Sequence, residues 1–300
     1  MDALLGVVVR SVVWLVSLLP LDQSRRFLGR LSALQLALNS RAAQTTRTNL
    51  ALCFPELNSR QLRGLARDSL AQTACIFAES GMLFHWSRQR WLALAKQHQT
   101  EPLRQALASG RGVLVLVPHF GNWEYLALYL GQFGALGLYE KPRIKSLEAP
   151  LIKARERSGM TMLPLDGAGL RSALRQLQDG GCLAMLPDQV PRRTSGVYAP
   201  FFGSPALTPS FAHRLIQRTS PVVLLGVARR IPSGFDVSFT AMGEDLAAGI
   251  YADSAEGYAT ALNQAIETVV REDPSQYQWE YKRFRRQPVG SADPYGEWNG

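Results

Sequence analysis

The sequence predicts an α/β fold with a largely parallel central sheet flanked by helices, and three observations support this. From Glu101 onward, short apolar segments alternate with amphipathic ones, as in βαβ units with right-handed crossovers. The apolar runs, such as residues 113–117, lack polar alternation and are typical of strands buried on both faces. Glycines at 110, 134 and 159 fall where predicted helices end, as C-terminal caps do.

The elements of this core follow from the same patterns. Helices are predicted over 101–108, 123–133, 148–157, 169–178, 208–219 and 255–271, and strands over 113–117, 136–139, 160–164, 182–187, 222–230 and 235–240. The last two strands are expected to form a hairpin at the sheet edge. No linker or repeat divides the chain, so we expect one α/β core over 101–288, a helical N-terminal region over 22–100 packed on it, and a loose tail over 289–300.

The first segment, 1–21, is predicted to be a hydrophobic, membrane-associated helix. It is apolar apart from Arg10 and two serines, but it is marginal for a bilayer span, which needs about 20 residues. It can either span or lie in the interface with Arg10 reaching out to the head groups. A signal peptide is disfavoured because no positive charge precedes the apolar run. The alternative is a core helix of a soluble protein. Arg25, Arg26 and Arg30 follow and favour a cytoplasmic location for the rest.

Charge and cysteine content restrict the class of function. The 300-residue chain has a formal net charge of +9, which indicates an anionic partner such as a membrane surface or a phosphorylated substrate. Nucleic acid is disfavoured because the arginines are dispersed and form no basic recognition helix. The three cysteines have no paired or metal-ligand spacing, which fits a reducing compartment. The four histidines form no metal-binding motif, so we expect neither a metal nor a cofactor.

The segment from Val113 to Glu124 carries the strongest indication of chemistry. His119 follows the apolar strand and a proline, Gly121-Asn122 predicts a turn with Asn122 as helix cap, and Glu124 falls in the first turn of the next helix. Functional groups gather at the carboxyl ends of strands in open α/β sheets. We therefore expect Glu124 to orient the imidazole of His119 as a general base. The alternative is a capped helix beside a buried, structural histidine.

No serine or cysteine stands beside this pair, so the substrate must supply its own hydroxyl or amine, which indicates direct acyl transfer. Other polar residues are predicted near the same edge of the sheet, although each of the cations can instead be part of a solvated face. They are Lys141, Arg143 and Lys145 after the strand 136–139, Arg155 in the next helix, and Asp188 with Gln189 after the strand 182–187. Phe201 and Phe202 either line an acyl trough or belong to the core.

Several motifs, taken in order, resemble one known family. HFGNWE at 119–124 is similar to the H-x4-D/E motif of glycerolipid-type acyltransferases, in the form found in the late lauroyl and myristoyl transferases of lipid A biosynthesis. Asn49-Leu50 with CFPE at 53–56, PDQ at 187–189, GVYAPFFG at 196–203 and QYQWEYKRF at 276–284 also match. The resemblance spans nearly the whole chain and implies a glycerol-3-phosphate acyltransferase-like fold.

The resemblance also implies a reaction and its partners. It implies an inner-membrane enzyme facing the cytoplasm that transfers a fatty acyl group from acyl carrier protein to a hydroxyl of a Kdo-bearing lipid A precursor. Arg155 is the closest match to a family arginine that binds substrate phosphate or stabilises the oxyanion, whereas Arg143 replaces a frequent asparagine. Lys282 and Arg283, in the last motif, are expected to bind an anionic head group, the alternatives being the acidic surface of a carrier protein and a solvated C-terminal helix.

Two other functions remain open from the sequence. The nearer alternative is an acyltransferase acting on another lipid, such as a lysophospholipid, a glycolipid or an ornithine-type lipid, with acyl-CoA as a possible donor. The more distant alternative is a non-enzymatic lipid-binding or scaffolding protein on the same fold.

Overall fold

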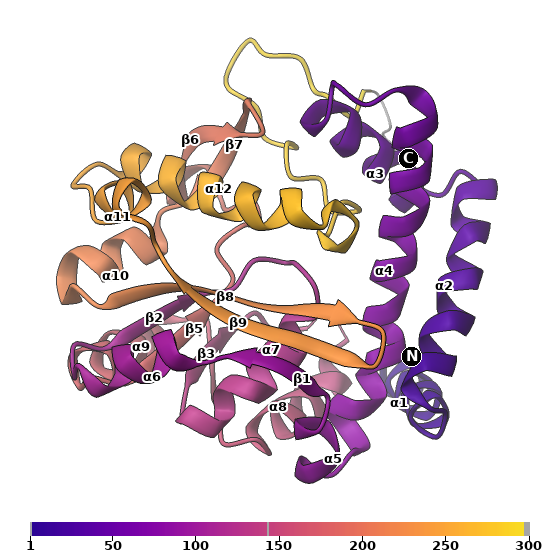
Figure 1. The fold of residues 1–300 in the computed structure, drawn as a ribbon, viewed down its shortest axis with the longest axis horizontal. Helices are drawn as coiled ribbons and strands as arrows, with labels where there is room; N and C mark the ends of the chain where they lie inside the picture. Colours follow the sequence, from indigo (N-terminus) through magenta and orange to yellow (C-terminus); the bar gives the residue numbers. More distant parts are fainter. Residues whose placement is uncertain (1, 143, 297–300) are drawn as a thin grey trace.

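The chain folds around one mixed sheet with helices on both faces (Figure 1), in a computed structural model that describes residues 2–142 and 144–296. The strand order is β1-β9-β8-β2-β5-β3-β4, and neighbours are parallel except for the antiparallel pair β8 and β9. The strands are β1 (Ala95–Gln99), β2 (Val113–Leu116), β3 (Leu136–Tyr139), β4 (Thr161–Pro164), β5 (Cys182–Met185), β8 (Val222–Ile231) and β9 (Gly234–Ala241). The predicted largely parallel sheet is confirmed.

The helices connecting these strands cover the sheet on both sides. They are α6 (Glu101–Ala108), α7 (Trp123–Leu130), α8 (Glu148–Glu156), α9 (Gly167–Gln178), α10 (Phe211–Thr219), α11 (Glu244–Ile250) and α12 (Ala255–Glu272). Alternate residues of β2 enter opposite hydrophobic clusters: Leu114 and Leu116 pack with residues of α9, α10 and α12, whereas Val113 and Val115 pack with α6 and α7. The continuous apolar run of β2 therefore reflects burial on both faces.

The hairpin expected at the sheet edge is flanked by a further strand, β1, which the sequence patterns did not indicate. The strand β1, of sequence AKQHQ, pairs in parallel with β9, so the β8–β9 hairpin lies inside the sheet and its predicted edge position is wrong. Four of the five β1 residues are exposed, which explains why apolar periodicity did not reveal it. A second hairpin, β6 (Gly196–Phe201) with β7 (Ser204–Pro209), forms in a stretch for which no strand was predicted.

The N-terminal region is a helical layer packed beside the sheet (Figure 1). Its elements are α1 (Asp2–Ser17), α2 (Leu21–Ala37), α3 (Arg41–Cys53), the long α4 (Ser59–His85) and the short α5 (Arg88–Leu92). The helix α1 has 16 residues, and Pro20 is the N-cap of the next helix, α2. The apolar segment predicted over 1–21 is therefore divided between two helices. Among the described residues, no helix combines the length and hydropathy needed to cross a membrane.

The C-terminal aromatic motif is irregular chain, mostly turns, built into the core, which corrects the alternative of a solvated helix. Trp279 and Phe284 are fully buried, and the buried amide of Asn49 donates to the carbonyls of Trp279 and Tyr281 at 2.7 and 2.8 Å. Two distant motifs are thereby joined. Tyr295 is joined to the core as well, because its buried hydroxyl donates to Asn49 Oδ1 at 2.6 Å.

Candidate active site

The site is built on the turn between β2 and α7. Gly121 has φ +58°, and a Cβ there would lie 2.1 Å from the carbonyl oxygen of Ala228, so the turn requires glycine. The backbone amide of Asn122 donates to the same Ala228 oxygen at 2.8 Å, and the amide of Gln278 donates to the His119 oxygen at 3.0 Å. Asn122 caps α7 as predicted, its Oδ1 accepting the amide of Tyr125. These bonds fix the backbone that carries His119.

The imidazole of His119 is paired with Asp188. Its Nδ1 lies 2.7 Å from Asp188 Oδ1, and the backbone amide of His119 donates to Oδ2 of the same carboxylate at 2.9 Å. The Asp188 side chain is 2 % exposed and that of His119 is 12 % exposed, so the carboxylate is buried while the ring still reaches the surface. Because β5 is the parallel neighbour of β2, residues that follow the two strands meet at one edge.

This carboxylate is held in its ionised form. Burial, the strongest single influence, raises the pKa of Asp188, but the charge of His119 and the two hydrogen bonds from His119 outweigh it and lower the pKa overall. An ionised Asp188 accepts the Nδ1 proton and so selects the tautomer whose Nε2 carries the free lone pair. This is the orientation that a general base requires.

Two glutamines lie on the other side of the ring. Gln189 Nε2 is 3.0 Å from His119 Nε2 and 3.2 Å from Gln278 Oε1. The indole of Trp123 packs edge to face against the imidazole, with ring centroids 4.9 Å apart. Nε2 is therefore covered by an amide that can exchange for a substrate hydroxyl, whereas the ring plane is fixed by packing.

Glu124 does not orient His119, which corrects the expected pairing. Its carboxylate accepts two hydrogen bonds from Arg155, at 2.9 Å from Nε and 2.6 Å from Nη2. The Glu124 charge, the main influence, raises the pKa of Arg155. The pair is partly exposed, with side-chain exposures of 24 % for Glu124 and 18 % for Arg155. Glu124 lies in the first turn of α7 and pairs with Arg155 of the helix α8 instead of with His119 at the strand end. It therefore fixes the guanidinium of Arg155 and does not orient the imidazole.

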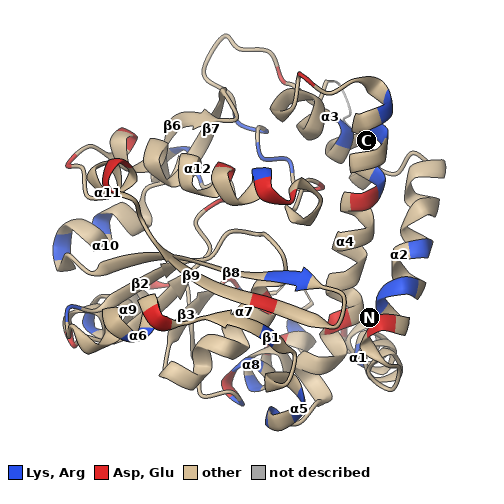
Figure 2. Cartoon of the chain, viewed as in Figure 1, with Lys and Arg blue, Asp and Glu red and all other residues tan. Residues whose placement is uncertain are grey.

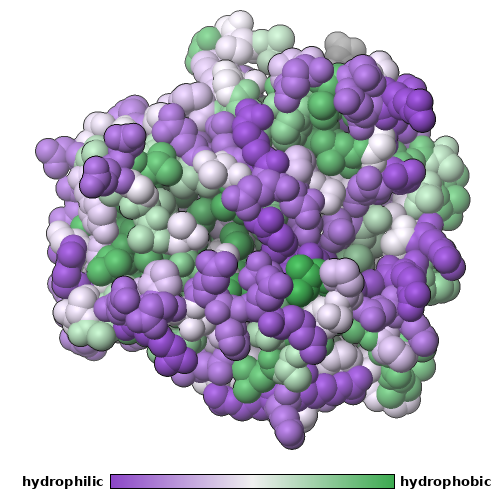
Figure 3. Space-filling view, viewed as in Figure 1, coloured by the Kyte–Doolittle hydropathy of each residue, from purple (hydrophilic) through white to green (hydrophobic). Residues whose placement is uncertain are grey.

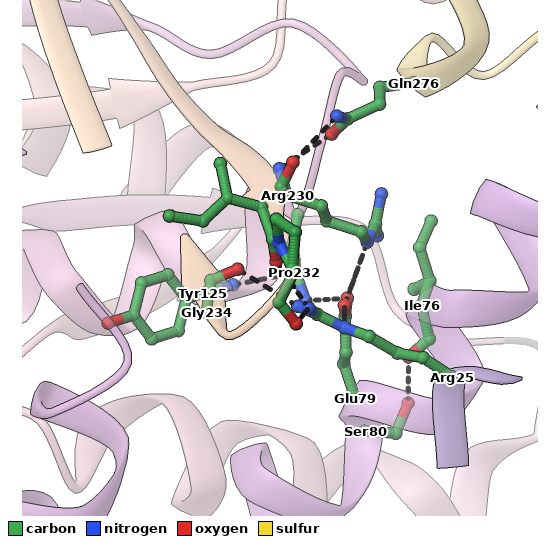
Figure 4. Close-up of polar contacts among 11 residues, drawn as sticks. Arg25, Ile76, Glu79, Ser80, Tyr125, Arg230, Pro232, Gly234 and Gln276 are labelled. Atoms are coloured by element: carbon green, nitrogen blue, oxygen red, sulfur yellow. Dashed lines mark hydrogen bonds and ion pairs between the residues drawn. The ribbon is translucent and has the colours of Figure 1, made fainter. Parts of the chain in front are cut away.

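A buried ionic cluster is hydrogen-bonded to the turn between β2 and α7. Figure 4 shows Arg25, Glu79, Arg230 and Gln276 of this cluster. Glu79 of α4 is 1 % exposed and accepts from Arg25 of α2 at 2.7 Å, from Arg230 of β8 at 2.9 Å, and from the Asn122 amide at 2.6 Å. Gln276 closes the cluster on the other side, its Oε1 accepting the Arg230 amide and its Nε2 donating to the Arg230 carbonyl. The cluster joins two N-terminal helices, the β8–β9 hairpin and the cap of α7.

The remaining predicted site residues include exposed and buried ones. Figure 2 marks the lysines and arginines of the chain in blue. Lys141 is exposed at the end of β3, where it and Arg171 contribute to lowering the pKa of Asp166, a shift caused mainly by hydrogen bonds from the amides of Gly169 and Ala168. Arg143 lies outside the described residues. Lys282 lies 5.1 Å from the ring of Tyr295, away from the imidazole contacts.

Arg283 is not a head-group ligand, which corrects the prediction for that residue. It is 2 % exposed and donates to the carbonyl of Leu207 at 2.8 Å and to the Thr208 hydroxyl at 2.9 Å. Phe201 and Phe202 are also core residues rather than the lining of a trough. The correction for Arg283 and the core position of the two phenylalanines both follow from the β6–β7 hairpin, which packs on the C-terminal motif.

Several residues of the site had no signal strong enough for prediction from the sequence. Asn122 was expected only as a cap, and Glu79, Trp123 and Gln278 were not singled out. A lone carboxylate within the apolar run CIFAESGMLF was the available indication for Glu79, because an unpaired charge there is unfavourable. Within the described residues, no group of His, Cys, Asp and Glu is arranged to hold a metal ion. Burial raises the pKa of Cys182 to about 12, so that thiol is no nucleophile.

Comparison with known proteins shows the family of the chain. A family model described as bacterial lipid A biosynthesis acyltransferase matches residues 3–286. The lipid A biosynthesis lauroyltransferase of Escherichia coli K12 is 28 % identical over 290 residues, covering 95 % of this chain and 92 % of that protein. The palmitoleoyltransferase of the same organism is 26 % identical over 297 residues, with the same coverage. A phosphatidylinositol mannoside acyltransferase of Mycobacterium tuberculosis H37Rv is 32 % identical over 130 residues, covering 41 % of this chain and 40 % of that protein. The chain is therefore an acyltransferase that belongs to the bacterial lipid A biosynthesis acyltransferase family.

Proposed function

We propose that this enzyme transfers a fatty acyl group from an acyl carrier protein thioester to a hydroxyl of a Kdo-bearing lipid A precursor, with His119 as general base. The observation that carries the proposal is the buried Asp188 carboxylate on His119 Nδ1, which leaves Nε2 to accept a proton. Family membership supports the acyl-transfer chemistry and the lipid A type of acceptor.

The reaction is a single displacement at the thioester carbonyl. The acceptor hydroxyl displaces the Gln189 amide from Nε2 and gives its proton to the imidazole as its oxygen forms the new C–O bond. The C–S bond then breaks, and the leaving thiolate takes the proton back from the imidazolium, so no net proton is gained or lost. Asp188 stabilises the imidazolium between the two steps.

Arg155 is proposed to stabilise the negative charge on the carbonyl oxygen. Its guanidinium is held by two hydrogen bonds to Glu124, which fixes its direction and so reduces the reorganisation needed in the transition state. Lys141 and Lys145, exposed after β3, are proposed to contact the acceptor's phosphates. No metal or small cofactor enters this scheme.

The enzyme is proposed to act at the inner membrane with its core on the cytoplasmic side. The first two helices expose large apolar side chains, including Leu4 at 70 %, Trp14 at 50 %, Phe27 at 59 % and Leu38 at 71 %. Arg26 and Arg30 lie among them on α2. Exposed aliphatic and aromatic side chains beside arginines suit an interfacial position at an anionic bilayer surface.

The test is an assay of the purified protein in detergent with acyl carrier protein thioesters and Kdo2-lipid IVA, followed by mass spectrometry. The expected product is heavier by one acyl group, and His119→Ala should lower the rate by about 10² to 10⁴. Product formed at the wild-type rate by His119→Ala would exclude His119 as the base, whereas no product with any thioester would exclude this acceptor or donor.

One observation favours a second acceptor class. The mycobacterial relatives of this chain are named for phosphatidylinositol mannoside, a glycolipid of a different kind, and the match to one of them reaches 32 % identity over 130 residues. The same base and cation can act on any lipid hydroxyl. A mannosylated phosphatidylinositol acceptor in the same assay decides between the two, because only one acceptor should gain an acyl chain.

A further inference from the structure

The helices α9 and α10 enclose an apolar groove whose edges are basic. The groove has a volume of about 210 Å³ and is lined by Leu170, Leu174, Phe211 and Leu215, together with Arg171, Arg214 and Arg218. In Figure 3, green apolar surface lies at the left of the molecule around α10, next to purple side chains. The volume is below the roughly 300 Å³ of typical small-ligand sites, so the groove suits a few side chains of a partner protein better than a whole lipid.

The charge of this surface has one sign. Within α9 and α10 the charged residues are Arg171, Arg175, Arg214 and Arg218, all exposed, with no carboxylate in either helix. Figure 2 marks the basic residues of α10 in blue. Within the described part of the chain, none of the four forms an ion pair. Arg171 lies near the carboxylate of Asp166, the N-cap of α9, but the charge within the two helices is positive, and four exposed cations around apolar side chains complement an acidic amphipathic helix.

The turn between α11 and α12 lies on the other flank of α10. His213 and Gln217 both contact the carbonyl oxygen of Ala252, which places the turn between α11 and α12 on that side. Arg214 and Arg218 are one position further along the helix and line the groove toward α9 instead. The groove therefore keeps its positive field.

The position of the groove fits delivery of a donor to His119. The helix α9 begins just after the carboxyl end of β4, and His119 follows the carboxyl end of β2, three strand spacings away, or about 15 Å across the sheet. Lys141, after the intervening β3, and Arg171 both lie near the carboxylate of Asp166, so cations occur at this edge as well as in the groove, with one carboxylate near them.

We propose that the groove between α9 and α10 is the docking surface for an acidic helix of the acyl carrier protein, an inference that rests on the donor proposed above. Apolar side chains of that helix enter between Leu170, Leu174 and Phe211 while its carboxylates meet Arg171, Arg214 and Arg218. The thioester then extends along the carboxyl edge of the sheet to His119.

The test compares two donors that carry the same acyl group, the carrier protein thioester and a free pantetheine thioester. The double variant Arg214→Glu/Arg218→Glu should raise the KM for the carrier protein thioester about tenfold or more, and it should leave the rate with the pantetheine thioester within about twofold. The variant Arg60→Glu/Arg63→Glu reverses two exposed arginines at the start of α4 and is the matched control, which should leave both donors unaffected.

The outcomes separate this inference from the donor assignment. An unchanged KM for the carrier protein thioester, or an equal loss with both donors, overturns the docking surface. A rise only in the KM for the lipid acceptor overturns it too, because the arginines then bind acceptor phosphates. Wild-type enzyme that uses the pantetheine thioester but not the carrier protein thioester would refute the donor itself.

Discussion

The carboxylates of Asp188 and Glu124 both serve the segment from His119 to Glu124, but they differ in burial and partner. Asp188 is 2 % exposed and holds an imidazole, whereas Glu124 is 24 % exposed and holds a guanidinium. A buried carboxylate can impose a tautomer because water does not compete for it, while a partly exposed bidentate pair mainly fixes the direction of a cation. Two catalytic functions, proton acceptance and oxyanion stabilisation, are thereby proposed for two separate pairs.

The largest expected effect comes from a substitution that removes the charge of Asp188 in the His119–Asp188 pair but keeps the size of its side chain. Asp188→Asn should lower kcat by about 10² to 10⁴, because an amide no longer selects the tautomer or stabilises the imidazolium. Steady-state kinetics with the wild type's preferred thioester measures this. The melting temperature is the control for folding, and a kcat close to wild type would assign the orientation of His119 to another group.

The ionic cluster around Glu79 offers a comparison between a buried and an exposed carboxylate. Glu79→Gln should lower the free energy of unfolding by about 3 to 5 kcal/mol, since two buried arginines lose their counter-charge. Glu272, 54 % exposed and paired with Arg229, is the matched control, and Glu272→Gln should cost about 1 kcal/mol or less. Urea denaturation measures both, and equal losses would contradict the structural role of the Glu79 cluster.

A double-mutant cycle tests whether Glu124 and Arg155 act as one unit. Glu124→Ala and Arg155→Ala should each lower kcat by about 10² to 10³, and the double variant should lose little more than either single variant. The losses from Glu124→Ala and Asp188→Asn should instead multiply when combined, because the two pairs serve different functions. Multiplying losses within the Glu124–Arg155 pair would show that Glu124 acts independently of the guanidinium.

The smallest effect concerns Glu280, a carboxylate near His119 whose pKa shifts in the opposite direction to that of Asp188. Burial is the main cause of the raised pKa of Glu280, although the Thr73 hydroxyl donates to it at 2.9 Å. The folded state therefore favours protonated Glu280, so its stabilising contribution is present below about pH 4 and is lost as the pH rises through the raised value. Asp188, with its lowered pKa, contributes above about pH 4 and loses its contribution in more acidic solution.

Glu280→Gln should accordingly raise the free energy of unfolding by about 1 kcal/mol at pH 7.5, and the gain should vanish near pH 4. Urea denaturation at both values measures the difference. Asp188→Asn provides the opposite case, with a loss of stability at pH 7.5. A Glu280→Gln variant that is less stable at pH 7.5 than at pH 4, relative to wild type, would contradict the sign of the shift.

The sequence by itself determined those features that depend on neighbouring residues. Alternating strands and helices, the place of His119 at a strand end, the turn at Gly121 and the cap at Asn122 all arise from local propensity and backbone sterics. The motifs also indicated the family, because their residue types and order extend over nearly the whole chain. The short strand β1 escaped this kind of inference because its residues are mostly exposed and polar.

Only the tertiary structure decided which partner each polar side chain has. Glu124 is five residues from His119, yet Asp188, 69 residues away, pairs with it because β5 lies beside β2 in the sheet. Arg283 was expected at a lipid surface, but the β6–β7 hairpin buries it. Side-chain pairing depends on strand order and on which segments cover one another, and these are set by burial of apolar surface across the whole chain rather than by spacing along it.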